Sequence, residues 1–170
     1  MKVLKVRLKK IYEDEAYMYV VLKTSIWKTC YNDILPKTYI DNISVHEKAL
    51  KYQQEMKNDS FVSYYFIVLS DTPIGVLRLK YFHNSVNENC LCIKDLYLLP
   101  NYQNKGYGAI IFRYIKEQAR EKKCIYITAW IIVKNQNAIN LGQKVGFKHT
   151  SSTQIHEKTG AILNEYYYKL

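Results

Sequence analysis

The sequence predicts an α+β domain over residues 1–170, with helices packed on a mixed, mostly antiparallel sheet of seven strands. The 170 residues, 48% of them hydrophobic, are enough for one sizeable core. Two strand-like runs, 61–69 and 74–81, are joined by a short polar turn, as in an antiparallel hairpin. An apolar run, a helical pattern and a second apolar run then fill residues 91–133. A crossover of that length returns the chain for parallel pairing.

Local patterns predict the individual elements. Leu4, Val6 and Leu8 alternate with basic residues, which predicts a half-buried strand. Residues 13–28 carry apolar side chains at helical spacing. A second helix begins with the capping box Ser44-x-x-Glu47 and runs to about residue 57. The remaining predictions are strands at 61–69, 74–81, 91–99, 124–133, 147–155 and 162–170, helices at about 109–122 and 137–145, and a polar loop at 84–89.

The strand at 91–99 has an irregular pattern. Leu91 and Ile93 share one parity, whereas Leu96 and Leu98 share the other. A strict two-residue period cannot place both pairs on one face. An extra residue near position 94 would reconcile them, which predicts a β-bulge. Alternatively, both faces of the strand are buried and no bulge exists.

Charge and cysteine content exclude several classes of protein. The net charge of +10 suits a phosphate-rich ligand, or it reflects a composition rich in Lys, Asn, Ile and Tyr. No cluster of Lys and Arg alternates with exposed aromatic residues in one segment, so we expect no nucleic-acid binding. The cysteines are Cys30, Cys90, Cys92 and Cys124, and no Cys-x-x-Cys pair occurs, so we expect free thiols and no metal site. With no expected signal peptide or membrane span, a cytoplasmic location follows.

A glycine-bearing turn follows the strand at 91–99 and leads into the next helix. The first turn of a helix has unpaired N–H donors and the positive end of the helix dipole. Gly106 and Gly108 remove side chains where a phosphate group would approach the backbone. This strand, turn and helix therefore predict an anion-binding cradle.

Three segments of the chain resemble one family. Gln103-x-x-Gly106-x-Gly108 resembles motif A of the Gcn5-related N-acetyltransferase (GNAT) family. Residues 135–147 resemble its motif B, Asn-x-x-Ala-Ile-x-x-Tyr-x-Lys-x-Gly-Phe, and residues 25–41 resemble the segment of one GNAT branch that contains Trp-x-x-x-Tyr. The three segments occur in family order and spacing, and the resemblance as a whole extends over nearly the whole chain. The resemblance implies a GNAT fold with a splayed parallel strand pair and about four helices.

The resemblance also implies the ligands. The cofactor is acetyl-coenzyme A, whose pyrophosphate binds the main chain of motif A. The Leu98 N–H is the candidate donor to the thioester carbonyl oxygen, which gains charge in the transition state. Trp27 and Tyr31 would line the acceptor site, although both rings could simply be core. The implied cofactor-binding residues are Tyr97, Leu98, Leu99, Gln103, Asn104, Lys105, Gly106, Tyr107, Gly108, Asn135, Leu141 and Lys144.

The acid and base of the family are missing from their usual positions. Many relatives have Glu eleven residues before the motif A Gln, where this chain has Cys92, and the motif B Tyr is replaced by Gly142. Asp95 is the candidate to replace the missing base. Alternatively, Asp95 is an exposed carboxylate on the bulge or a salt-bridge partner of Lys94. Tyr166, in the aromatic C-terminal run, is a candidate acid or pocket wall, or an ordinary strand aromatic. A thiol pKa of about 8.5 also makes unassisted departure of the thiolate tolerable.

The predicted function is acetyl transfer from acetyl-coenzyme A to an amine of a small molecule, such as a polyamine or an amino compound. One alternative is transfer to a peptide or protein N-terminus. A second is a catalytically silent acyl-coenzyme A sensor, which the missing Glu and Tyr would suit. A third alternative is a basic protein that binds nucleic acid. The sequence leaves the oligomeric state open, with a homodimer as one candidate.

Overall fold

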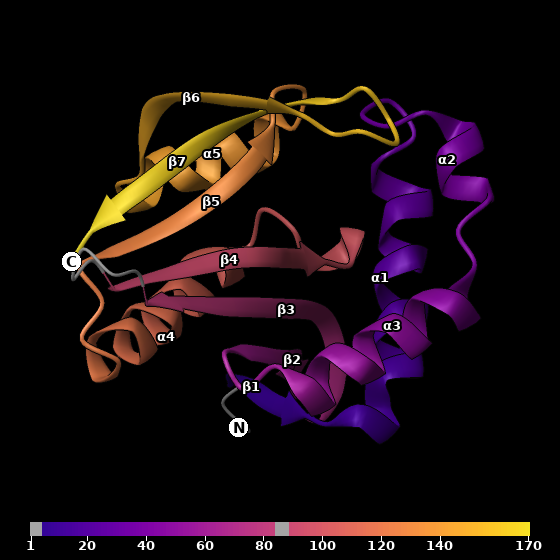
Figure 1. Ribbon diagram of the computed structural model, residues 1–170, viewed down its shortest axis with the longest axis horizontal. Helices are drawn as coiled ribbons and strands as arrows, with labels where there is room; N and C mark the ends of the chain where they lie inside the picture. Colours follow the sequence, from indigo (N-terminus) through magenta and orange to yellow (C-terminus); the bar gives the residue numbers. More distant parts are fainter. Residues whose placement is uncertain (1–4, 84–88) are drawn as a thin grey trace.

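The computed structural model describes residues 5–83 and 89–170, and Figure 1 shows a twisted sheet with helices packed against it. Leu4 and most of the predicted loop at 84–89 lie outside the described residues. The strands are β1 (Val6–Ile11), β2 (Val62–Leu69), β3 (Thr72–His83), β4 (Asn89–Leu98), β5 (Tyr126–Ile132), β6 (Lys148–Ile155) and β7 (Ile162–Lys169).

The strand order is β1-β2-β3-β4-β5-β7-β6. All neighbouring pairs are antiparallel except β4 and β5, which are parallel. The mixed sheet and its parallel pair are therefore as predicted. The hairpin between β2 and β3 turns at Ser70 and Asp71, which both have positive φ, as a tight two-residue connection requires.

The described residues form five α-helices: α1 (Ala16–Cys30), α2 (Lys37–Asp41), α3 (Val45–Asn58), α4 (Tyr107–Glu121) and α5 (Gln136–Val145). Short 3-10 turns precede α1 (Glu13–Glu15) and α4 (Pro100–Tyr102). The predicted caps are present, since Ser44 Oγ accepts from the Glu47 N–H at 3.2 Å and Gly146 ends α5 with φ 101°. The sequence prediction missed α2, which is too short to show a helical period. No described helix is long and apolar enough to cross a membrane.

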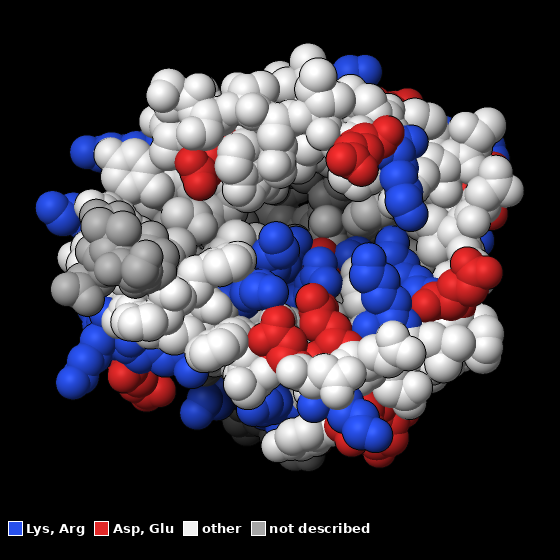
Figure 2. All heavy atoms as spheres, viewed as in Figure 1, with Lys and Arg blue, Asp and Glu red and all other residues white. Residues whose placement is uncertain are grey.

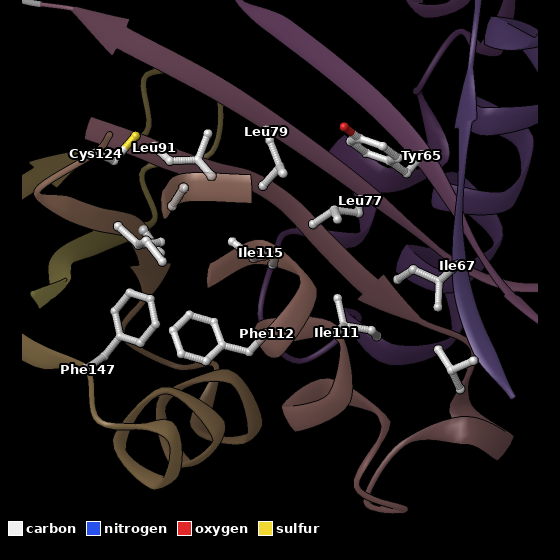
Figure 3. Close-up of a cluster of buried hydrophobic side chains, with 14 of the residues drawn as sticks. Tyr65, Ile67, Leu77, Leu79, Leu91, Ile111, Phe112, Ile115, Cys124 and Phe147 are labelled. Atoms are coloured by element: carbon white, nitrogen blue, oxygen red, sulfur yellow. The ribbon is translucent and has the colours of Figure 1, made fainter. Parts of the chain in front are cut away.

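Each face of the sheet has its own apolar core. Figure 3 shows Ile111 and Ile115 of α4 directed toward Leu77 and Leu79 of β3, whereas Phe112 points toward Phe147. The opposite face of the sheet packs against α1 and α3 through a second cluster.

The predicted bulge in β4 is confirmed. Leu79 of β3 lies opposite Ile93, whereas Arg78 lies opposite Asp95, so that Lys94 is the extra residue. Because of this insertion, Leu91, Ile93, Leu96 and Leu98 all face the α4 core. The alternative, a strand buried on both faces without a bulge, is wrong. The bulge also turns Asp95 and Tyr97 onto the face of α1.

Candidate active site

The parallel strands β4 and β5 separate partway along their length. They are paired from Cys90 and Tyr126 to Ile93 and Ala129, and no further. Beyond Ile93, β4 continues on β3 alone, whereas β5 continues on β7 alone. The two strands therefore leave main-chain groups of β4 unpaired on the side of β5.

The N–H of Leu98 is one of these groups. The neighbouring Leu99 donates its N–H to the Ile74 carbonyl of β3 at 2.9 Å. Successive N–H groups of a strand point to opposite edges, so the Leu98 N–H points toward the separated β5. The Leu98 carbonyl, on the same edge, accepts from Gln103 Nε2 at 2.8 Å. Gln103, a predicted cofactor ligand, thus fixes the end of β4.

The N-terminus of α4 follows this edge directly. Gly106 is its N-cap residue with φ 82° and ψ −3°, and no side chain caps the helix there. A Cβ added at Gly106 would meet nothing within 4 Å, so the terminus borders open space. An uncapped helix end with free space beside it fits a diphosphate. Asn104 and Lys105 are exposed on the same turn, and Lys144 is exposed on α5.

Gly108 has a packing role in addition to the cofactor contact predicted for it. It is buried, and a Cβ there would lie 2.6 Å from Leu141 Cδ2. Gly108 therefore permits α4 to pack closely on α5, and Leu141 fills the space that Gly108 leaves. The cofactor contact predicted for Leu141 stays a prediction.

Gly142 occupies the position where the family often has Tyr. A Cβ at Gly142 would make ordinary contacts, 3.7 Å from Phe147 Cβ and 3.9 Å from Ile131 Cδ1. Gly142→Ala is therefore expected to raise the free energy of unfolding by about 0.5–1 kcal/mol, because alanine favours the helix. Chemical denaturation measures this change. Gly108→Ala, which has no such space, is expected to lower stability in the same assay, and equal effects of the two substitutions would contradict this packing.

Aromatic rings cluster where the two strands have separated, together with Ile132 of β5. Trp27 and Tyr31 of α1 stack with centroids 5.7 Å apart, and the ring of Tyr97 meets both edge-on, at 5.8 and 5.6 Å. Tyr39 of α2 lies 6.3 Å from Trp27. Asn135 caps α5 and donates to the Tyr31 hydroxyl at 2.7 Å. We call Trp27, Tyr31, Tyr39 and Tyr97 the aromatic pocket.

Asp95 lies beneath this pocket in a buried ion cluster. Its carboxylate contacts Lys23 Nζ at 2.8 Å and Arg78 Nε at 3.0 Å, and it accepts from the Tyr19 hydroxyl at 3.1 Å. Burial alone would raise the pKa of Asp95, but the charges of Lys23 and Arg78 hold it below its usual range. The exposed bulge carboxylate and the Lys94 partner considered above are both wrong. A carboxylate so fully engaged is a poor proton acceptor, which weighs against Asp95 as the base.

Tyr166 faces away from the aromatic pocket. It lies opposite Ala129 in the register of β5 and β7, and both residues belong to the α4 core. Only 7% of Tyr166 is exposed. This placement weighs against Tyr166 as an acid or acceptor wall, because its ring is enclosed by apolar core. The next residue along β7 toward the gap, Glu165, lies opposite Trp130 and hence on the other face.

Cys92 and Glu165 share that other face. Cys92 pairs in register with Thr128. Burial raises the pKa of the Cys92 thiol, and the charge of Glu165 raises it further. A protonated thiol cannot serve as the base, whereas Glu165 accepts from Thr150 Oγ1 at 3.1 Å and has no ion-pair partner among the described residues. Figure 2 shows a hollow on this side of the molecule, bordered by Lys and Arg atoms.

Sequence reasoning missed several residues of this site. Tyr39 lies on the unpredicted α2, and the pairing of Arg78 with Asp95 depends on the strand register. One signal was available, since Tyr19, Lys23 and Trp27 are spaced four apart and so share one face of α1. A lysine between two aromatic residues on a buried helix face indicates a buried charge that needs a partner.

Comparison with known proteins identifies the fold and the family. The model of the acetyltransferase (GNAT) family matches residues 26–147. A thialysine N-epsilon-acetyltransferase from Caenorhabditis elegans is 22% identical over 126 residues, covering 72% of this chain and 78% of the relative.

Solved structures agree over nearly the whole chain. PaiA N-acetyltransferase from Thermoplasma acidophilum, solved with coenzyme A, superposes with a TM-score of 0.75 at 18% identity, covering 97% of this chain and 100% of that one. A variant of spermidine N-acetyltransferase SpeG from Vibrio cholerae gives 0.69 at 15% identity, covering 96% and 93%. With the family match over residues 26–147, the chain belongs to the GNAT family of acetyl-coenzyme A-dependent N-acetyltransferases.

Proposed function

We propose that this enzyme acetylates the amine of a small molecule that enters through the aromatic pocket. The observation that carries the proposal is the separation of β4 and β5 beyond Ile93 and Ala129. On one side of the gap lie the Leu98 N–H and the open end of α4. On the other lies the aromatic pocket, so a thioester reaching through the gap would meet an acceptor there.

Acetyl-coenzyme A supplies an activated acetyl group: the amine nitrogen forms a bond to the carbonyl carbon, the carbon–sulfur bond breaks, and the thiolate leaves. The N–H groups at the start of α4 hold the pyrophosphate. The Leu98 N–H donates to the carbonyl oxygen as negative charge develops on it. The bulge at Lys94 and the bond from Gln103 to the Leu98 carbonyl keep that N–H directed into the gap.

Glu165 is the proposed base. An alkylamine has a pKa of about 10.4, so the attacking nitrogen must lose a proton. Glu165 lies on the face of Cys92, the position where many relatives have Glu, and it is not neutralised by a described cation. A carboxylate there, acting directly or through water, would accept the proton.

Glu165→Gln is therefore expected to lower kcat about 100-fold while leaving the affinity for coenzyme A unchanged. Initial rates and a coenzyme A titration measure the two quantities. Denaturant unfolding of Glu165→Gln separates loss of folding from loss of the base, because an amide at this position is expected to leave the stability close to that of the wild type. An unchanged kcat for Glu165→Gln would remove Glu165 from the mechanism.

The far side of the aromatic pocket favours a small acceptor. The turn between β6 and β7 packs onto it, since His156 meets Tyr39 edge-on at 5.9 Å and Ala161 joins the same cluster. This closure disfavours an extended peptide. The names of the relatives, which act on thialysine and spermidine, agree with a small amine.

Thiol release from acetyl-coenzyme A with a panel of small amines tests the proposal. Amine-dependent release above the hydrolysis background is the expected result. Tight coenzyme A binding without turnover on any amine would instead support the acyl-coenzyme A sensor. Turnover on peptides alone would support the N-terminal acetyltransferase.

A further inference from the structure

The rim of the aromatic pocket carries a cation that the rest of the site leaves without a counterion. Lys48 of α3 is half-buried, and its Nζ lies 5.1 Å from the centre of the Trp27 ring. Lys23 Nζ lies 5.2 Å from the same ring. Lys23 is paired with Asp95, but Lys48 has no ion pair within the described ranges 5–83 and 89–170.

The nearby carboxylates are already engaged. Asp95 contacts both Lys23 and Arg78. Glu55 contacts Arg78 Nη1 at 3.1 Å and also accepts a short hydrogen bond from the Tyr64 hydroxyl. These two carboxylates face three cationic side chains, Lys23, Lys48 and Arg78, so the cluster has one positive charge in excess.

Two further observations agree with an anion at this rim. Burial, and then the positive charges of Lys23, Arg78 and Lys158, lower the pKa of Lys48 to about 8 against the opposing charge of Asp95. The ammonium form still predominates at neutral pH. In addition, Trp27 Nε1 is buried with no acceptor among the described residues. The Trp27 Nε1–H group and the Lys48 ammonium lie at the same ring, and each is a donor that needs an acceptor atom.

We infer that the acceptor carries a carboxylate as well as its amine, and that Lys48 binds the carboxylate at the rim of the aromatic pocket. This inference rests on the proposed function and names the class of its substrate. The acceptor then lies with its anionic end at Lys48 and its amine toward Glu165 and the gap. A polyamine would instead bring further ammonium groups against Lys23 and Lys48, whose neighbouring carboxylates Asp95 and Glu55 are already paired.

Matched pairs of acceptors test the inference. Glycine, β-alanine and lysine are each compared with their carboxamides, beside spermidine, in the thiol-release assay. The wild-type enzyme is expected to prefer the carboxylate over the carboxamide by about tenfold in kcat/KM, the size of one charge-assisted hydrogen bond. Lys48→Met should bring that ratio close to one, and Lys48→Arg should restore most of it.

Two controls show whether a change in the carboxylate-to-carboxamide preference is specific to Lys48. Lys51→Met removes an exposed charge from the same helix and should leave the preference intact. Because the amine pKa differs between an amino acid and its amide, each kcat/KM is expressed per concentration of neutral amine, and this correction is the same for all variants. The KM for acetyl-coenzyme A should not change in any of them.

The outcomes separate the two proposals. Faster turnover of spermidine or of the carboxamides by the wild type, or an unchanged ratio in Lys48→Met, overturns the inference while leaving small-molecule acetylation standing. Absence of amine-dependent turnover on every acceptor, with coenzyme A still bound, overturns the proposed function and this inference with it.

Discussion

Gly106→Val is expected to lower the affinity for coenzyme A about 100-fold. Gly106 has φ 82°, a conformation that a β-branched residue adopts only with strain, and it borders open space at the uncapped start of α4. A valine side chain would occupy the space proposed for the pyrophosphate and tilt the first N–H groups of the helix. Losing about two charge-assisted hydrogen bonds corresponds to a change of this size. Calorimetric titration with coenzyme A measures it.

Gly160→Val is the matched control for this substitution. Gly160 also has positive φ, 67°, and an added Cβ there meets nothing within 4 Å. The backbone strain is therefore similar, but the residue lies in the turn between β6 and β7. Equal losses of coenzyme A affinity in the two variants would mean that strain, rather than the anion site, accounts for the effect.

Asp95→Ala is expected to lower the free energy of unfolding by about 3–5 kcal/mol, because it leaves Lys23 and Arg78 buried without their shared partner. Denaturant unfolding measures the loss. Asp41→Ala is the control, because Asp41 pairs with Lys37 on the surface, with 51% of its side chain exposed. That pair is expected to contribute no more than about 0.5 kcal/mol.

The pH dependence of the free energy of unfolding is a second test of the ion cluster around Asp95. The pKa of Asp95 in the folded chain lies below its value of about 3.9 in the unfolded chain. The contribution of ionised Asp95 to the free energy of unfolding is therefore present at neutral pH and is lost as the pH falls below about 4. Asp95→Asn should remove this part of the acid dependence. If Asp95→Ala folded with wild-type stability and lost only turnover, the carboxylate would be the base after all.

The sequence was most informative where a local pattern has one structural solution. The parity change between Ile93 and Leu96 can be reconciled on one face only by an extra residue, and the bulge is there. Ser44 and Gly146 marked helix ends because capping and positive φ are properties of the residue itself. The order of strand, helix and strand likewise determined the parallel pair.

The parts of the site that depend on register could not be predicted. Asp95 meets Lys23 and Arg78 only because the bulge turns it toward α1, and no spacing in the sequence connects these three residues. The close packing of Gly108 on Leu141 of another helix likewise has no signal in the sequence. Tyr166 and Tyr167 look alike in the sequence, yet they lie on opposite faces of β7.

A crystal structure of the complex with coenzyme A tests the central claim most directly. The account predicts pyrophosphate oxygens within hydrogen-bond distance of main-chain N–H groups in residues 104–109. It also predicts the sulfur between β4 and β5, beyond Ile93 and Ala129. A diphosphate bound elsewhere, or strands that pair along their whole length in the complex, would contradict it.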